Sequence, residues 1–428
     1  MNKKHIISFI GLTHLSLVYG LASAAKGYKI NFYDNDKEIV DLYNKGVFSI
    51  DEPGLNEVYL KYINFLSFSY QVENLKNSKL IFIAPDIETD HRGRSNLNKI
   101  NKLLKLVLKN IKPNQPIIIL SQVKPGFTRN VSKLHKLTYY MVETLIFGEA
   151  LNRALNPERL IIGKSFQNIK INKYFLDYLE YFSKKIIQMN YESAELTKIS
   201  INIYLATSVS TTNFLNDIAN KLGASWDQIK ASLKLDKRIG EFAYLEPGLG
   251  ISGGNIERDL RSIKNLSILH KVNNSLVKSI KQNSSHYKDW PFRILKQNNF
   301  YNKNIGILGL TYKENTNSIK NSPSVRFIKK IIKILKVKKN QIFAHDPKIK
   351  KINLINITYF DNCFDLINNC QILVIMTKWD VYKQIKPNIF KKKFKGSIII
   401  DPYQTLDCRI RNSNNYKIFT IKTENLLR

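Results

Sequence analysis

The chain has 428 residues, too many for one hydrophobic core, and 43% of them are hydrophobic, which is ordinary for a globular protein. Its 67 Lys and Arg against 34 Asp and Glu give a net charge of +33, but the basic residues are scattered and no nucleic-acid-binding motif occurs, so we expect no nucleic-acid partner. No run of about eighteen apolar residues indicates a membrane span, and three cysteines without metal-ligand spacing, Cys363, Cys370 and Cys408, indicate a cytoplasmic protein with neither disulfides nor a metal site.

The first 25 residues allow two interpretations. They have the basic start, apolar stretch and Ala-Ser-Ala end of a secretory signal. Alternatively, 6–10 is a buried strand, 11–16 a turn and 17–26 a helix, and the run 27–34 is the next strand, which ends at Asp34. We favour the second interpretation, because a βαβ unit that lacked its first strand would not close.

Short β-rich runs alternate with helical stretches through the first part of the chain, at 5–11, 29–34, 79–85, 116–121 and 159–163. This alternation predicts a parallel sheet with helices on both faces. From Ser193 to Leu222 the apolar spacing changes to that of one long helix, with Gly223 as its C-cap. A helix of this length needs partners, so it either joins the domains or pairs with a second subunit.

The last part of the chain returns to the alternating pattern. The polar segment 281–303 is weakly patterned and is predicted to be a linker. A strand and turn follow at 304–310, and a helix starts at Ser322 with a proline at its first position. Further buried strands are predicted at 341–347, 372–377 and 397–401.

We therefore predict an α/β protein with two Rossmann-like, doubly wound parallel-sheet domains joined by a central long-helix region. The expected domains are residues 1–190, 191–295 and 300–428.

The first turn, GLTHLS, resembles a dinucleotide-binding turn, which requires glycine at three positions. Gly11 is present, but Thr13 stands at the second position and Ser16 at the third. Asp34 ends the next strand, where an acid would hold the ribose hydroxyls of NAD. On this motif alone, a βαβ unit that binds nothing is an equal alternative, and the Thr13 side chain predicts weak NAD binding.

Seven ordered segments carry a wider resemblance: NKGVFSIDEPGL, NPERLIIG, SAELTKISINIYLAT, FLNDIANKLGA, PGLGISGGNIERDL, ILGLTYKENTNSIKNSP and TKW. Together they resemble the UDP-glucose/GDP-mannose dehydrogenase family, from about residue 5 to about residue 405.

The resemblance implies an NAD-dependent, four-electron oxidation of a nucleotide-sugar alcohol to a uronic acid, a precursor for polysaccharide synthesis. A cysteine captures the aldehyde, and the resulting thioester is hydrolysed. It also implies that the first domain binds NAD, that the last domain binds the nucleotide sugar, and that the central helices form a homodimer.

The resemblance assigns catalytic roles to four residues. Glu143 matches a general base for thioester hydrolysis, and Asp259 matches an aspartate that helps to activate water. Lys198 and Asn202 match residues that stabilise an oxyanion, and their spacing places both on one helical face. Without the resemblance, a solvated helix face would be the simpler interpretation of this pair.

Substrate contacts are implied for Lys313, Gly253, Gly254 and Arg238. The family's Gly-Gly-Ser-Cys loop continues here as Asn255 and Ile256, so Asn255 lies near the position of the missing nucleophile. An amide is not an effective nucleophile.

Two further segments depart from the family pattern. Ser121-Gln122-Val123-Lys124 lacks a threonine expected to hold water, and Asp401-Pro402-Tyr403-Gln404 lacks an arginine expected to contact the substrate. Two hypotheses follow: an impaired nucleotide-sugar dehydrogenase, or an inactive pseudoenzyme that serves as a nucleotide-sugar-binding or scaffold protein.

Overall fold

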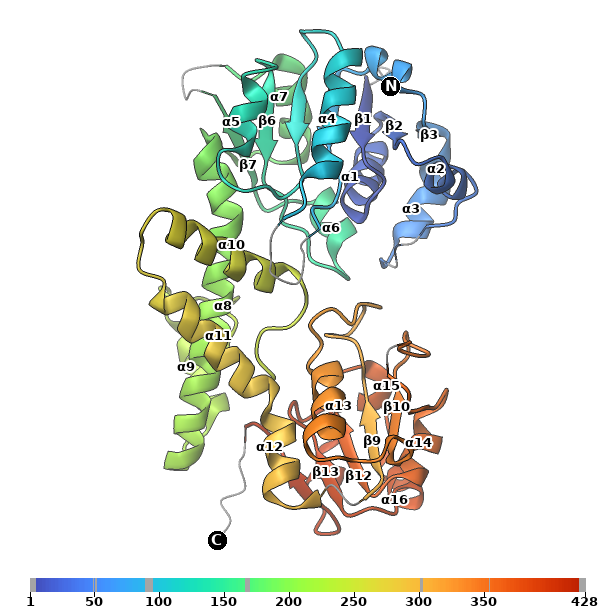
Figure 1. Ribbon diagram of the computed structural model, residues 1–428, viewed down its shortest axis with the longest axis vertical. Helices are drawn as coiled ribbons and strands as arrows, with labels where there is room; N and C mark the ends of the chain where they lie inside the picture. Colours follow the sequence, from blue (N-terminus) through green and yellow to red (C-terminus); the bar gives the residue numbers. More distant parts are fainter. Residues whose placement is uncertain are drawn as a thin grey trace. The chain divides into compact units, whose positions relative to one another are not determined.

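A computed structural model describes residues 5–422, apart from 49, 51, 89–94, 166–169, 301–302 and 354. The outer ends of the domains expected at 1–190 and 300–428 lie outside the described residues. The chain forms two compact units, residues 1–201 and 202–428 (Figure 1). No helix in the described part of the chain is long and apolar enough to cross a membrane.

The first unit contains an eight-stranded sheet with the order β3-β2-β1-β4-β5-β6-β7-β8. Every neighbouring pair is parallel except β6 and β7, which are antiparallel. Its first six strands have the strand order of a dinucleotide-binding Rossmann fold. The strands are β1 (Ile6–Ile10), β2 (Lys29–Tyr33), β3 (Leu66–Ser69), β4 (Leu80–Ile83), β5 (Ile117–Ile119), β6 (Thr138–Met141), β7 (Leu160–Lys164) and β8 (Ile186–Asn190).

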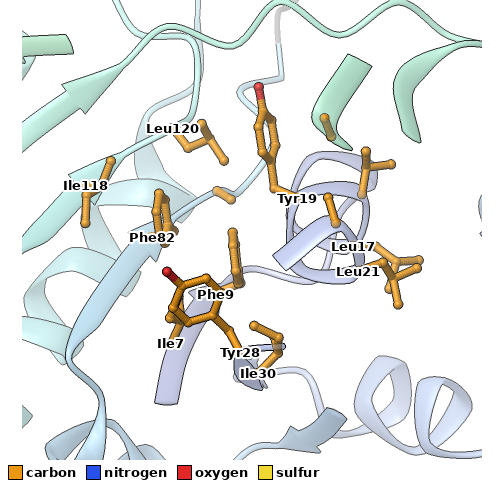
Figure 2. Close-up of a cluster of buried hydrophobic side chains, with 14 of the residues drawn as sticks. Ile7, Phe9, Leu17, Tyr19, Leu21, Tyr28, Ile30, Phe82, Ile118 and Leu120 are labelled. Atoms are coloured by element: carbon orange, nitrogen blue, oxygen red, sulfur yellow. The ribbon is translucent and has the colours of Figure 1, made fainter. Parts of the chain in front are cut away.

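Two hydrophobic clusters cover the two faces of this sheet, because successive strand side chains point to opposite faces. Phe9 and Phe82 belong to the cluster beneath α1, α6 and α7, and Figure 2 shows both rings on the side of α1. Ile10 and Ile83 belong to the opposite cluster, which includes side chains of α4 and α5. The helices and short 3-10 turns of this unit are α1 (His14–Ala25), α2 (Lys37–Asn44), α3 (Leu55–Tyr62), η1 (Ile63–Phe65), η2 (Val72–Asn77), α4 (Asn98–Asn110), α5 (Phe127–Ser132), α6 (Ala150–Leu155) and α7 (Lys173–Phe182).

The first helix begins earlier than predicted. Residues 6–10 form β1 at the centre of the sheet, as the strand–turn–helix interpretation expects, but α1 starts at His14, where a helix from 17 was predicted. Thr13 is the N-cap, and its side chain accepts a hydrogen bond from the Ser16 N–H. The turn after β1 is shorter than predicted because the Thr13 hydroxyl caps the helix and so starts it at His14.

The second unit begins within α8 (Tyr191–Leu222), the long helix predicted near Ser193. Its six-stranded sheet is parallel throughout, with the order β11-β10-β9-β12-β13-β14. The strands are β9 (Ile305–Leu308), β10 (Ile342–His345), β11 (Thr358–Tyr359), β12 (Ile372–Ile375), β13 (Ile398–Ile400) and β14 (Lys417–Phe419). The helices are α9 (Trp226–Leu235), α10 (Asn255–Leu269), α11 (Ser275–Lys288), α12 (Trp290–Gln297), α13 (Pro323–Ile334), α14 (Cys363–Asn369), α15 (Asp380–Lys383), α16 (Pro387–Lys393) and α17 (Cys408–Arg411), with a 3-10 turn, η4 (Lys339–Gln341).

The prediction of a linker at 281–303 is wrong. This segment contains the end of α11 and all of α12. Tyr287, Trp290 and Leu295 are buried, and Trp290 and Leu295 belong to the core of the second sheet. Polar residues conceal the apolar spacing, because Ser284 and Lys288 are buried beside the apolar side chains while others, such as Gln282 and Lys296, are exposed.

Candidate functional site

The turn between β1 and α1 requires glycine at its first position. Gly11 has a φ of +91°, and a Cβ on it would lie 2.9 Å from the backbone of Pro85. Both the left-handed backbone and the missing space exclude a side chain there. The Gly11 N–H donates to the Tyr33 carbonyl (2.8 Å), which joins the turn to the end of β2.

Thr13 and Ser16, at the other two glycine positions of the motif, hydrogen-bond to each other. The Thr13 N–H donates to Ser16 Oγ (2.9 Å), and the Ser16 N–H donates to Thr13 Oγ1 (3.4 Å). Thr13 Oγ1 also donates to the Ala84 carbonyl (2.8 Å). This reciprocal pair is a capping box. It occupies two backbone N–H groups at the helix N-terminus, the groups that hold a pyrophosphate in a dinucleotide site.

Asp34 lies beside the same turn, fully buried. Its Oδ2 accepts the Leu12 N–H (2.8 Å), its Oδ1 accepts the Asp36 N–H (3.1 Å), and Lys99 Nζ lies 3.7 Å from Oδ2. The structure therefore brings Asp34 to the Gly11 turn, and both carboxylate oxygens already have partners within the chain.

The second unit contains a turn of the same construction. Gly309 has a φ of +96°, and its N–H donates to the His345 carbonyl (2.8 Å). Asp346, at the end of β10, accepts the N–H groups of Leu310 (2.7 Å) and Thr311 (3.1 Å) through Oδ2.

Glu143 and Lys198 form an ion pair in the first unit. Lys198 Nζ lies 2.7 Å from Glu143 Oε1, and the two side chains are only 8% and 14% exposed. Glu143 Oε2 accepts the Leu145 N–H (2.9 Å). The pairing joins the loop after β6 to α8, and it excludes the solvated helix face as an account of Lys198.

A carboxylate that sequence reasoning missed, Glu52, holds the same loop. It accepts the N–H groups of Gly148 (3.1 Å) and Ala150 (2.7 Å), and its Oε2 lies 3.1 Å from His14 Nε2. Burial opposes ionisation, but these donors outweigh it and keep the pKa of Glu52 below its usual range. The His14 ring stacks on Phe147 at 4.4 Å. No local sequence pattern predicts the contacts of Glu52, because its partners are far from it in the sequence.

Asn202 and Asp259 meet in the second unit. Asn202 Nδ2 donates to Asp259 Oδ2 at 2.5 Å, and both side chains are buried. Asp259 Oδ1 lies 3.4 Å from the Arg258 Nε. The Asn202 amide on α8 and the Asp259 carboxylate on α10 are therefore held together.

A glycine loop leads into α10 next to this pair. Gly253 has a φ of +77°, and a Cβ on it would meet the Tyr312 ring at 2.8 Å. Gly254 packs against the stem of Lys320. Asn255 and Ile256 are the first two residues of α10, and no side chain caps the helix.

Lys288, at the end of α11, supports this loop through a side-chain amide. Lys288 Nζ donates to Asn321 Oδ1 (2.7 Å), and Asn321 Nδ2 donates to the carbonyls of Ile251 (3.3 Å) and Gly253 (3.2 Å). Burial lowers the pKa of Lys288 to about 8. Sequence reasoning missed this residue, since an isolated lysine carries no positional signal.

Three family models match the chain in succession. They are the NAD binding domain at residues 5–175, the central domain at 192–285 and the UDP binding domain at 306–408 of the UDP-glucose/GDP-mannose dehydrogenase family. The chain belongs to this family. Together the matched ranges span most of the sequence.

Two relatives are similar to this chain over nearly its whole length. UDP-glucose 6-dehydrogenase of Rickettsia prowazekii is 28% identical over 438 residues, covering 98% of this chain and 99% of the relative. UDP-glucose 6-dehydrogenase TuaD of Bacillus subtilis is 26% identical over 418 residues, covering 92% and 88%.

Solved structures share the fold. A UDP-glucose dehydrogenase from Pyrobaculum islandicum has a TM-score of 0.84 at 22% identity, covering 98% of each chain. A UDP-D-ManNAc dehydrogenase from Pyrococcus horikoshii has a TM-score of 0.80 at 20% identity, covering 97% of this chain and 99% of the other.

The remaining residues suggested by the family resemblance lie in different surroundings. Lys313 is half-buried in the turn after β9. Arg238 is exposed and forms a paired contact with Asp236, whose Oδ1 accepts its Nε (3.0 Å) and Oδ2 its Nη2 (2.6 Å). At the position expected to hold an arginine, Tyr403 packs against Gly248 and accepts the Leu249 N–H (3.4 Å).

The three cysteines lie in the last part of the chain. Cys363 and Cys370 are buried in a core cluster of the second sheet, and Cys408 is exposed at the start of α17. Burial raises the pKa of the Cys370 thiol to about 12. No group of three or more His, Cys, Asp or Glu side chains suited to a metal ion occurs among the described residues.

Proposed function

We propose that this protein is a nucleotide-sugar dehydrogenase homologue that does not carry the oxidation of its sugar through to the uronic acid. The proposal rests on the start of α10, whose first two residues are Asn255 and Ile256, the positions that the family resemblance matches to a Ser-Cys pair. A thiolate at a helix N-terminus is stabilised by the helix dipole and attacks an aldehyde readily. A neutral amide and an alkyl side chain do neither.

No other thiol of the chain is a ready substitute. The buried Cys363 and Cys370 belong to the core beneath β12, and burial raises the pKa of both thiols, which disfavours the nucleophilic thiolate. Cys408 lies on α17, in a different segment from the glycine loop. An aldehyde formed at the site would therefore leave it or remain as its hydrate.

The polar residues to which the family resemblance assigns catalytic roles are present, and each unit pairs its own two residues. The Lys198 ammonium, held by Glu143, would stabilise an alkoxide, and the Asn202 amide, held by Asp259, would position a carbonyl oxygen. With no thioester to hydrolyse, Glu143 has no base chemistry to perform. We infer that these residues now serve to bind and orient a nucleotide sugar.

The cofactor turn fits NAD poorly. Two successive NAD molecules would each accept one hydride in the family reaction, but the NAD pyrophosphate needs backbone N–H groups that Thr13 and Ser16 occupy. The Thr13 methyl also adds bulk where the family has bare backbone. This feature favours the second candidate function, an inactive pseudoenzyme that binds a nucleotide sugar or acts as a scaffold.

One set of measurements separates the two functions. The purified protein is titrated calorimetrically with NAD and, separately, with UDP-glucose, UDP-N-acetyl sugars and GDP-mannose, and the products of a mixed incubation are analysed. Reduced cofactor with an aldehyde product supports the impaired enzyme, whereas sugar binding without reduced cofactor supports the pseudoenzyme. Stoichiometric uronate, with two reduced cofactors per sugar, contradicts both.

Two cysteine variants extend the test. Asn255→Cys and Ile256→Cys, made separately, place a thiol at each of the first two positions of α10. Recovery of uronate formation in one of them is expected if the rest of the pocket is intact. If neither recovers, the cofactor turn and the absence of the substrate arginine are further lesions.

We also propose a homodimer formed through the central helices. Large apolar side chains are exposed on α8, at the end of α9 and on the segment after α9, including Leu222 (77%) and Phe242 (89%), with Tyr204, Phe214 and Leu235. Exposed apolar groups in such number mark an interaction surface.

A further inference from the structure

The first unit has a groove on the side of the sheet opposite α1, between α4 and α5. Its volume is about 830 Å³. It lies over the core cluster that contains Ile10 and Ile83, whereas α1 packs on the other face. The residues that line it are Leu97, Asn101, Leu104, Lys105, Leu108, Lys109, Lys124, Pro125, Gly126, Phe127, Asn130, Val131 and Leu134.

The shape of this groove suits a helix. Its α4 residues recur three or four positions apart, so they form one stripe along the helix. From Leu97 to Lys109 the stripe is about 18 Å long, the length of about three helical turns. Phe127 and Val131 form part of its floor, and Leu134, which is 75% exposed, stands at its edge. An exposed leucine beside an apolar floor leaves a surface that a second apolar face would cover.

Basic side chains dominate the surface of this groove, although Arg129 beside it pairs with Glu192 (2.8 Å) and the Gly126 N–H donates to the buried Glu195 (2.6 Å). Lys105, Lys109 and Lys124 are exposed along it, and none of the described residues that line it is acidic. The asymmetry extends beyond the groove, because residues 95–142 contain no Asp or Glu. Their basic residues are Lys99, Lys102, Lys105, Lys109, Lys112, Lys124, Arg129, Lys133 and Lys136.

We propose that the groove binds an acidic amphipathic helix of a partner protein. The apolar face of such a helix would lie on Leu104, Leu108 and Phe127, and its carboxylates would meet the lysines along the edge. A second copy of this chain is a poor occupant, because a net charge of +33 on each copy opposes contact through a basic surface. The groove uses neither the Gly11 turn nor Glu143, so the partner does not need a functioning active site.

The probe for this proposal is a labelled synthetic helix of about fifteen residues, with leucines three and four apart and glutamates beside them. Fluorescence anisotropy with the full chain is expected to give a dissociation constant of about 1–100 μM. Lys105→Glu combined with Lys109→Glu is expected to weaken binding about tenfold or more, since each reversal replaces attraction by repulsion. Lys391→Glu combined with Lys392→Glu makes the same charge change on α16 and should leave binding within about twofold.

One further peptide, one lipid and one further variant decide the outcome. A scrambled peptide of the same composition has the charge without the apolar stripe and should bind at least about tenfold more weakly. Equal binding of the scrambled peptide, or an unchanged affinity in the Lys105 and Lys109 variant, overturns the proposal in favour of bulk charge attraction. Saturable binding of a long-chain carboxylate such as decanoate, without binding of the helix, overturns it in favour of a lipid site. Leu134→Asp, at an exposed position that leaves the fold intact, should weaken the helix without lowering the melting temperature.

Discussion

Replacing Thr13 and Ser16 together by glycine should strengthen NAD binding. In the native turn, each side chain bonds to the backbone N–H of the other residue, so both N–H groups are unavailable to a pyrophosphate. The double substitution frees these two donors and removes the bulk of Thr13. Relief of a clash of this kind is typically worth about 1–3 kcal/mol, which corresponds to an affinity gain of about tenfold to a hundredfold.

The same change should cost some stability. Glycine replaces a hydroxyl N-cap at a loss of a few tenths of a kcal/mol, and glycine in the first turn of α1 costs about 1 kcal/mol more. Thermal unfolding should therefore show a lower melting temperature while calorimetry shows tighter NAD binding. A lower melting temperature together with a lower dissociation constant for NAD would show that the site has been freed, and not that the protein has become more stable.

The matched control is Ser322→Gly, which removes the N-cap of α13 in the other unit, where Ser322 Oγ accepts the N–H groups of Ser324 and Val325. It should lower the melting temperature without changing NAD affinity. A dissociation constant of about 1 μM or below for the native protein would show that the capping box is no obstacle. Failure of the double variant to tighten binding would equally refute the reasoning.

Three other results are expected. Glu143→Gln or Lys198→Met alone should lower the free energy of unfolding by about 3 kcal/mol, because each removes one charge of a largely buried ion pair, whereas the double variant should recover most of it in denaturant titrations. Burial lowers the pKa of Lys288 to about 8, so the unfolded chain binds more protons than the folded chain between about pH 8 and about pH 10.4. The free energy of unfolding should therefore rise with pH across this window, by up to about 3 kcal/mol relative to Lys288→Met. Leu222→Asp combined with Phe242→Asp should give monomers in sedimentation experiments without a lower melting temperature, and an unchanged sedimentation coefficient would contradict the proposed dimer surface.

Central, fully buried strands were predictable because they read as continuous apolar runs. The predicted strand 6–10 coincides with β1, and the run at 372–377 contains β12. Short strands such as β3 and β11 were not predicted, because only a few of their side chains are buried and polar residues interrupt the apolar pattern. Helix α12 was missed for a different reason, since it has only eight residues and contains a proline, Pro291.

The positions of site residues were predictable only where a motif of known geometry contains them. The approach of Asp34 to the Gly11 turn follows from the βαβ arrangement, and the structure confirms their proximity. The meeting of Glu143 with Lys198 required the family resemblance, since the two residues are distant in the sequence. Glu52 has no signal at all, because its partners are backbone N–H groups of a distant loop.

The two aspartates that close the glycine turns have a consequence for inheritance. Asp34 and Asp346 each accept backbone N–H groups of the turn that begins at Gly11 or Gly309, with no ligand involved. Loss of either carboxylate would leave buried donors unsatisfied, so each is retained by the requirement to fold. Selection for foldability alone would therefore be sufficient to preserve the glycine and the acid of such a turn, whether or not the turn binds a cofactor. Thr13 and Ser16 are constrained less strongly, because replacing their capping box by glycine costs only about 1 kcal/mol, so these positions can vary while the fold is kept.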